Sequence, residues 1–255
     1  MNNNNNKWMF LSASTLKIIA MILMVIDHIG YQFYSQLGEY YEVFRIFGRL
    51  SLPIFAYLIT DGMIHSRNKI KYILQMLILG IGIELVDQMF IHTNQGNIMT
   101  TLGLSALSIY FLQKDKWSEK LLSILPLVVV ILGDPDLEIT NIKVQYGIYG
   151  FITVLGFYIS YLISSKINLK NKILIRNIIS SLFLIIFNLL WMLIAGKTNF
   201  WDNYSISIQI YAIFASILII FYSGKRGYNK QWFKWFCYLF YPLQFILIYL
   251  AYMLI

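Results

Sequence analysis

The first long apolar stretch, Ser14–Tyr34, places a carboxylate and an imidazole side by side at Asp27 and His28. An imidazole titrates near neutral pH, so His28 could take a proton from a reacting group and return it. Successive helical residues point about 100° apart, so Asp27 is not expected to orient its neighbour. We expect Asp27 instead to pair with Arg45 or Arg49, which share a helix face at i and i+4, and His28 to face the reacting groups.

Other polar residues fall at about the same depth as this pair. A charged side chain inside the hydrocarbon costs at least ~2.5–3.5 kcal/mol, so such residues are paired, hydrated or functional. Counting about 1.5 Å per helical residue from the nearest segment end places them in one layer in the outer half of the membrane. We therefore predict a polar chamber that opens outward. The predicted catalytic residues are Asp27, His28, Arg49 and Glu84, the predicted substrate contacts are Arg45, Asn188, Gln209 and Gln145, and Thr100 and Thr101 lie at the same height.

Each of these predictions has a plainer alternative. Asp27 and His28 could form an ion pair that only fixes helix packing, although ionisable residues inside a membrane are functional by default. Arg49 could be a structural counter-ion, because a buried guanidinium suits pairing as well as substrate contact. Glu84 lies close enough to a helix end to be solvated. These alternatives stay open at the level of the sequence.

Nine mostly apolar segments are available to position these residues. Only 13% of the residues are charged and 58% are apolar, whereas a soluble globular chain carries about 25% charged residues. We therefore predict an all-α, polytopic transmembrane bundle of about nine helices, a single domain over residues 14–255 after a disordered polar tail over residues 1–13. The segments are Ser14–Tyr34, Phe44–Ile64, Ile70–Met89, Ile98–Leu112, Leu121–Gly133, Tyr146–Ile163, Ile173–Ala195, Tyr204–Tyr222 and Trp235–Leu254.

The loops between these segments alternate in charge. Cytoplasmic loops carry an excess of Lys and Arg, so the basic loops predict a multi-pass protein of the bacterial cytoplasmic membrane, with the N-terminus in the cytoplasm and the C-terminus outside. Spreading the net charge of +8 over four loops also argues against a nucleic-acid partner and for contact with the lipid bilayer. The basic loops contain Arg67, Lys69 and Lys71; Lys114, Lys116 and Lys120; Lys166, Lys170, Lys172 and Arg176; and Lys225, Arg226, Lys230 and Lys234.

Several other classes of site are disfavoured. The single Cys237 excludes a disulfide framework within the chain and a cysteine metal cluster. The three histidines show no paired ligand spacing, so we predict no metal site and no permanently bound cofactor. The absence of a clear internal repeat weighs mildly against a transporter built from paired halves.

The polar motifs and their neighbours resemble the TraX family, membrane proteins associated with conjugation whose founding activity is N-acetylation of the pilin amino terminus. A helix-one His followed by an R…P-F helix two is also distantly similar to integral-membrane acyltransferases that move acetyl groups to sugars. The N-terminal stretches carry most of the resemblance. In chain order the stretches are STLKIIAMILMVIDHIG, RIFGRLSLPIFAYLITDG, HSRNKIKY, NIMTTLGL, YGIYG, YSGKRG and FCYLFYPLQFILIYL.

The resemblance can be carried over position by position. Asp27 and His28 stand in its DHIG motif. The GRL-x-x-P-I-F stretch and the segment after it match at Arg49, Pro53, Phe55, His65, Asn68 and Tyr72. Four positions depart from the pattern: Gln145 replaces an acid, Gln244 replaces the His of a final Y-P-x-H, Ser223 replaces an Asn and Gln75 replaces an Arg. Losing the late His leaves His28 as the one deeply placed base.

The residues and the resemblance together lead to acyl transfer as the main hypothesis. Acetyl-CoA would dock at the cytoplasmic face, where His65 and the cations Arg67, Lys69 and Lys71 would meet its phosphates. His28 would serve as general base on an extracytoplasmic amine or hydroxyl acceptor, a protein N-terminus or a glycan, or would carry the acetyl group itself. The alternatives are a transporter or proton-relay channel through Asp27, His28 and Glu84, and a non-catalytic assembly factor of a conjugation or secretion machine.

Overall fold

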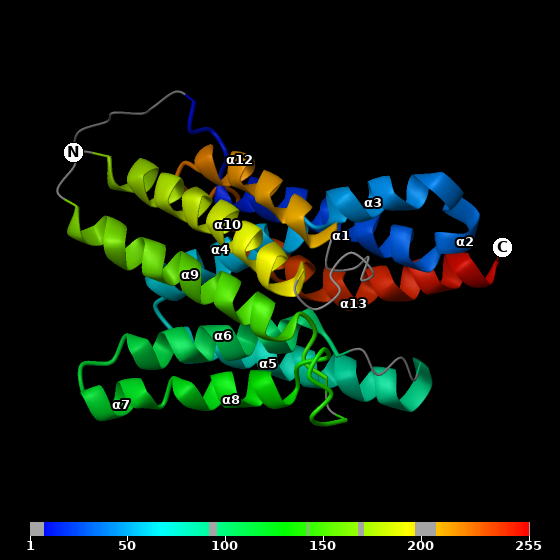
Figure 1. The fold of residues 1–255 in the computed structure, drawn as a ribbon, viewed down its shortest axis with the longest axis horizontal. Coiled ribbons are helices and arrows are strands. Elements are labelled where there is room, and N and C mark those ends of the chain that lie inside the picture. Colours follow the sequence, from blue (N-terminus) through cyan, green and yellow to red (C-terminus); the bar gives the residue numbers. More distant parts are fainter. Residues whose placement is uncertain (1–7, 92–95, 142, 168–170, 197–207, 255) are drawn as a thin grey trace. The chain divides into compact units, whose positions relative to one another are not determined.

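The computed structural model describes residues 8–91, 96–141, 143–167, 171–196 and 208–254, and over these residues the chain is helical (Figure 1). The β-type pairing found in the described residues is an isolated parallel bridge between Leu11 and Tyr222. The chain divides into two compact units, the first made of Met1–Phe55 and Ser160–Ile255 and the second of Ala56–Ile159. The prediction of an all-α fold is confirmed.

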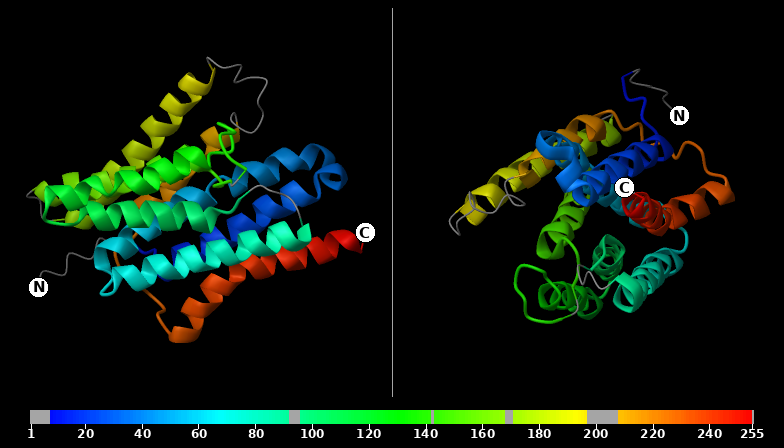
Figure 2. Two further views of the ribbon diagram at one scale, coloured as in Figure 1. Left: turned by 90° about the horizontal axis from the view of Figure 1, so that it is seen from below. Right: turned by 90° about the vertical axis from the view of Figure 1, so that its right-hand side faces the viewer.

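The first unit gathers helices from both ends of the chain. α1 packs against both α3 and α13, and α10 packs against the 3-10 turn η4 and α12. Figure 2 shows that the red C-terminal helix runs beside the blue N-terminal one. The elements are α1 (Ala13–Gln32), α2 (Tyr34–Leu37), η1 (Gly38–Tyr40), α3 (Tyr41–Gly48), the start of α4 (Ser51–His65), the end of α9 (Gly147–Lys166), α10 (Lys172–Gly196), η4 (Ile210–Phe214), α12 (Ala215–Ile220) and α13 (Gln231–Met253).

The second unit is built around α6, which packs against α5, α7 and α8. An apolar cluster of Leu104, Val130, Val144 and Phe151 lies at its centre. Asn68 and Asn97 fix where two of its helices begin, because their side chains accept the backbone N–H groups of Lys71 and Thr100 at 2.9 and 3.1 Å. The elements are the rest of α4, α5 (Lys69–Val86), η2 (Asp87–Ile91), α6 (Ile98–Leu112), α7 (Trp117–Leu121), α8 (Ile124–Leu132) and most of α9.

Five stretches of helix in the described part of the chain are long and apolar enough to cross a membrane. They are α1, the run from Tyr34 to His65, α9, the residues Lys172–Ile194 of α10, and α13. Two shorter apolar helical stretches, Ile98–Leu112 and Ile210–Ile220, fall on the predicted fourth and eighth segments. Each of the nine predicted segments is mostly helical where the structure describes it, although short turns at residues 49–50 and 122–123 interrupt the second and the fifth. The side of the membrane on which each end lies stays a prediction.

The α10 helix turns small polar residues toward its neighbours. Its buried face carries Asn177, Ser180, Ser181, Leu184 and Asn188, which recur at helical spacing. The Ser181 hydroxyl donates to the Ser216 carbonyl at 3.2 Å, and the Asn177 amide donates to the Tyr222 carbonyl at 2.8 Å. Small and polar residues of this kind let membrane helices approach closely and hydrogen-bond across their interface.

The chain just before α1 is held by the loop after α12. The Leu11 amide donates to the Phe221 carbonyl at 3.1 Å, and the Ser223 amide donates to the Leu11 carbonyl at 2.8 Å. Ser12 then caps α1 by accepting the Thr15 amide at 3.2 Å. Residues 1–7 of the predicted polar tail lie outside the described residues, whereas this final part of it is fastened to the first unit.

Candidate functional site

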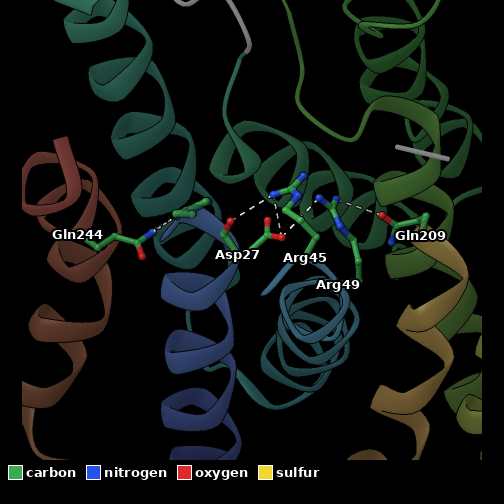
Figure 3. Close-up of polar contacts among 6 residues, drawn as sticks. Asp27, Arg45, Arg49, Gln209 and Gln244 are labelled. Carbon is green, nitrogen blue, oxygen red and sulfur yellow. Dashed lines mark hydrogen bonds and ion pairs between the residues drawn. The ribbon is translucent and has the colours of Figure 1, made fainter. Parts of the chain in front are cut away.

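The centre of the first unit is an Asp27 carboxylate shared by two arginines. Arg45 Nη1 lies 2.8 Å and Arg49 Nη2 lies 3.4 Å from the same oxygen, Oδ1 of Asp27 (Figure 3). Arg45 Nη1 also donates to the Asp27 backbone carbonyl at 3.3 Å. Asp27 and Arg49 are both buried. The sequence left open which arginine would pair with Asp27, and the structure shows that both do.

This cluster carries more positive than negative charge. Two guanidinium groups meet one carboxylate. Arg49 Nη1 also donates to the neutral Gln209 Oε1 at 3.4 Å, and Arg45 lies over the Tyr31 ring at 5.6 Å. Charges away from water interact strongly because the surroundings screen them little. The cluster is therefore suited to stabilise a negative charge on a bound group.

Close approach of α1 and α3 makes this arrangement possible. A Cβ at Gly48 would collide with the Asp27 side chain, and a Cβ at Gly30 would lie 2.7 Å from Phe44 Cβ. Arg45 and Arg49 are four residues apart, so they leave α3 on the same face and reach Asp27 together. Glycine is required at the crossing because any larger residue would separate the arginines from the carboxylate.

His28 faces a different neighbour from Asp27, as the turn of about 100° between adjacent residues requires. Its Nδ1 lies 2.8 Å from Nε2 of the Gln244 side chain on α13. The His28 ring is tilted by 32° against the Phe245 ring, with 4.3 Å between the ring centroids, and the Tyr241 ring meets it edge-on at 6.5 Å. One helix, α13, thus supplies all three of these contacts to the imidazole.

Gln244 is the site residue that the sequence analysis missed. It appeared there only as a departure from the family pattern. A signal was present, because an amide in the middle of an apolar helix must find a partner when it is buried. Gln244 is 4% exposed and lies two residues after Pro242, which removes one backbone donor from α13.

The remaining predicted substrate and catalytic residues divide between the units. Asn188 is buried in the first unit, and its amide donates to the Leu184 carbonyl at 2.8 Å within α10. Glu84 belongs to the second unit, where its carboxylate accepts from Gln88 and Asn97, each at 3.4 Å. Gln145, also in the second unit, accepts the Thr101 hydroxyl on its backbone carbonyl. Arg45 and Arg49 contact Asp27 directly, and Gln209 joins the cluster through its hydrogen bond from Arg49.

The residues predicted to bind acetyl-CoA lie together where α4 passes into α5, in the second unit. His65 Nδ1 lies 2.9 Å from the Asp61 carbonyl oxygen and 3.4 Å from its carboxylate, and the His65 side chain is 56% exposed. Arg67 and Lys71 are exposed, and Lys69 Nζ donates to Gln113. These cations surround the N-terminus of α5, an end whose helix dipole also favours anions.

Comparison of the sequence with known proteins identifies relatives of this chain. The chain is 35% identical over 112 residues to a probable fimbrial assembly protein, FimC, of Dichelobacter nodosus, covering 38% of this chain and 45% of that protein. It is 30% identical over 100 residues to an uncharacterized protein of Rickettsia prowazekii, covering 39% of this chain and 37% of the relative. The chain thus spans less than half the length of each of these curated relatives, and no solved structure matches it significantly. The model of the TraX protein family matches residues 12–251, so the chain belongs to the TraX family.

Proposed function

We propose that this protein is an integral membrane acyltransferase that moves an acetyl group from cytoplasmic acetyl-CoA to an amine or hydroxyl at the outer face of the bacterial cytoplasmic membrane. The observation that carries the proposal is an imidazole, His28, that follows Asp27 directly in α1, while Asp27 belongs to a buried cluster with one excess positive charge. Acyl transfer needs both features, a group that moves a proton and a positive field where negative charge develops.

In the proposed reaction His28 removes the proton of the acceptor N–H or O–H as that atom attacks the thioester carbonyl. The new bond to the acetyl carbon forms while the carbonyl oxygen becomes negative, a charge that Arg45 and Arg49 oppose. The C–S bond then breaks, and the leaving thiolate takes the proton from His28, which yields free CoA and acetylated acceptor. Asp27 stays ionised and holds the two guanidinium groups in place.

Different observations support the proposed donor and the proposed acceptor. Arg67, Lys69 and Lys71 gather at the start of α5, and a cluster of cations suits the phosphates of CoA. The Dichelobacter nodosus relative is named for fimbrial assembly, which favours the amino terminus of a pilin-type protein over a glycan as the acceptor. The lipid bilayer surrounds the apolar helices in either case.

The test is an acetyl-transfer assay with protein purified into nanodiscs, radiolabelled acetyl-CoA, and a panel of pilin-type amino-terminal peptides and envelope glycans. We expect the wild type to label one class of acceptor and His28→Ala to lose about 10²–10⁴ of that rate, the range that a general base supplies. Ile22→Ala is the matched control, because Ile22 is an exposed apolar residue of the same helix. A folded wild type that neither binds CoA saturably nor labels any acceptor would end the proposal.

A non-catalytic role in pilus assembly is the second candidate, favoured by the name of the same relative. It makes the opposite prediction for one experiment. If the protein only assembles or stabilises a partner, cells that carry His28→Ala would assemble as many pili as the wild type. The acyltransferase proposal expects that variant to make the protein but to leave the acceptor unmodified.

A further inference from the structure

We propose that Gln244 is a positioning residue that fixes which nitrogen of His28 carries the proton. The inference rests on the proposed function, because it explains how His28 can serve as its base. The contact joins residues 216 positions apart in sequence, on α1 and α13. The Gln244 side chain is buried, and its amide lies 2.8 Å from His28 Nδ1.

A neutral imidazole has one N–H and one lone pair, so this contact can form in two ways. If the Gln244 amide N–H donates to Nδ1, the ring proton sits on Nε2, and the only lone pair of the ring is occupied by Gln244. If the Gln244 carbonyl oxygen accepts from Nδ1–H instead, the lone pair sits on Nε2. The two arrangements differ by a rotation of the amide, whose oxygen and nitrogen are assigned from the hydrogen-bond network.

The chemistry of a base selects the second arrangement. In the first, His28 has no free lone pair with which to take a proton from an acceptor. In the second, Nε2 is the base, and the Nδ1–H bond to Gln244 persists unchanged when Nε2 becomes protonated. Either orientation leaves one end of the amide buried without a hydrogen-bond partner in the described chain, so the chemistry of the base decides between them.

The ring contacts support the same role. Phe245 and Tyr241 pack against the imidazole from the same helix that carries Gln244. Helix α13 thus fixes the orientation of the His28 ring as well as the nitrogen that carries its proton. Asp27 cannot take this role, because its carboxylate is committed to Arg45 and Arg49 on another face of α1. A neutral acceptor also keeps the ring from being charged in the resting state, which an acidic neighbour would favour.

The tautomer can be read without any transfer reaction, because the protein contains only three histidines. In nanodiscs with ¹⁵N-labelled histidine, the His28 signals are assigned by their loss in His28→Ala. We expect Nδ1 to resonate as a protonated, pyrrole-type nitrogen and Nε2 as an unprotonated, pyridine-type nitrogen. The reverse pattern in the wild type overturns the proposal.

Three variants separate positioning from mere packing. Gln244→Leu should lose the tautomer preference and about ten- to a hundredfold of kcat, with little change in KM, as loss of a supporting hydrogen bond commonly does. Gln244→Glu keeps an acceptor oxygen at the same length, so it should keep the protonated Nδ1. Because its charge favours the imidazolium, it should bring kcat to within about tenfold of wild type only at a pH that leaves Nε2 unprotonated. Gln231→Leu, an exposed amide of the same helix, is the matched control and should change neither reading.

The outcomes distinguish this inference from the function on which it rests. A protonated Nδ1 that survives in folded Gln244→Leu shows that another group sets the tautomer, and the inference falls. If Gln244→Leu does not fold, the test passes to Gln244→Glu. An unprotonated Nδ1 in that variant would overturn the inference. If every spectrum is as expected but the wild type transfers no acetyl group, Gln244 keeps its role and the proposed function fails.

Discussion

At the scale of single residues, the Asp27 cluster consists of a buried carboxylate that serves two guanidinium groups. Asp27 and Arg49 are buried, and Arg45 is largely covered. The sequence was sufficient to predict that Asp27 pairs with Arg45 or Arg49, because i, i+4 spacing places both arginines on one face, but it did not show that both do. A buried amide in an apolar helix indicated that Gln244 has a partner, but not which one, because His28 lies 216 residues away.

Replacing Asp27 by Asn should therefore destabilise the protein more than removing one arginine. Asp27→Asn leaves two buried positive charges without a counter-ion, a loss of about 3–5 kcal/mol, whereas Arg45→Met leaves the Asp27–Arg49 pair intact. The double variant, with one uncompensated charge, should fall between them. Heat-unfolding midpoints from tryptophan fluorescence in one detergent give the order, and Asp27→Asn as stable as Arg45→Met would contradict the charge count.

At the scale of elements, the positions of the predicted segments agree with the helices, but their internal form does not follow from apolar runs. The eighth predicted segment, Tyr204–Tyr222, is a 3-10 turn over Ile210–Phe214 followed by the short α12 where it is described. Its last carbonyls are taken by Asn177, which donates to Ile220 at 3.3 Å and to Tyr222 at 2.8 Å. A side chain of α10 thus hydrogen-bonds the carbonyl groups at the end of this helix. The hydropathy of the segment does not predict this contact.

The crossing of α1 and α3 gives a test at this scale. Gly48→Ala would place a methyl group on the Asp27 side chain, so we expect lower stability and a loss of acetyl transfer of at least about tenfold, because a well-packed crossing that must move costs about 1–3 kcal/mol. Gly82→Ala in α5 is the matched control. A Cβ there meets nothing within 4 Å, and alanine is the better helix former, so this variant should be at least as stable as wild type.

Equal effects of the two alanines would mean that helix propensity, and not the approach of α3 to Asp27, decides the outcome. Size-exclusion profiles and unfolding midpoints of both variants in the same detergent separate the cases. Gly48→Ser is a second test, because its Cβ occupies the same space as the alanine methyl group and its hydroxyl adds further bulk, so this variant should fail in the same way.

At the scale of the whole molecule, the sequence predicted a bundle of about nine helices from apolar length and from alternating loop charge. The helices are present in the described residues, but only five stretches are long and apolar enough to cross a membrane by themselves. α5 has 18 residues and carries Lys69, Lys71 and Glu84, so its charge keeps it out of that group. The charge of the loops, rather than the length of the helices, supports the larger number of crossings.

Reporter fusions decide the topology. Alkaline phosphatase should be active when it is fused after Asp136 or after Leu254, which the charge pattern places outside, and inactive when it is fused after Lys166, which it places in the cytoplasm. Fluorescent-protein fusions at the same positions should show the opposite pattern. An inactive phosphatase after Leu254, with the other two fusions as expected, would mean that the chain crosses the membrane an even number of times after Lys166 instead of the predicted three, and would place the C-terminus inside.

The pairing of His28 with Gln244 also sets the moment in the life of the protein at which its chemistry can begin. Gln244 lies 216 residues after His28, so a ribosome that has delivered α1 to the membrane must still make most of the chain before this neighbour exists. A product cut short before α13 would hold every charged group of the Asp27 cluster and still lack the residue that we propose readies His28. On that proposal, only a chain that includes α13 is competent.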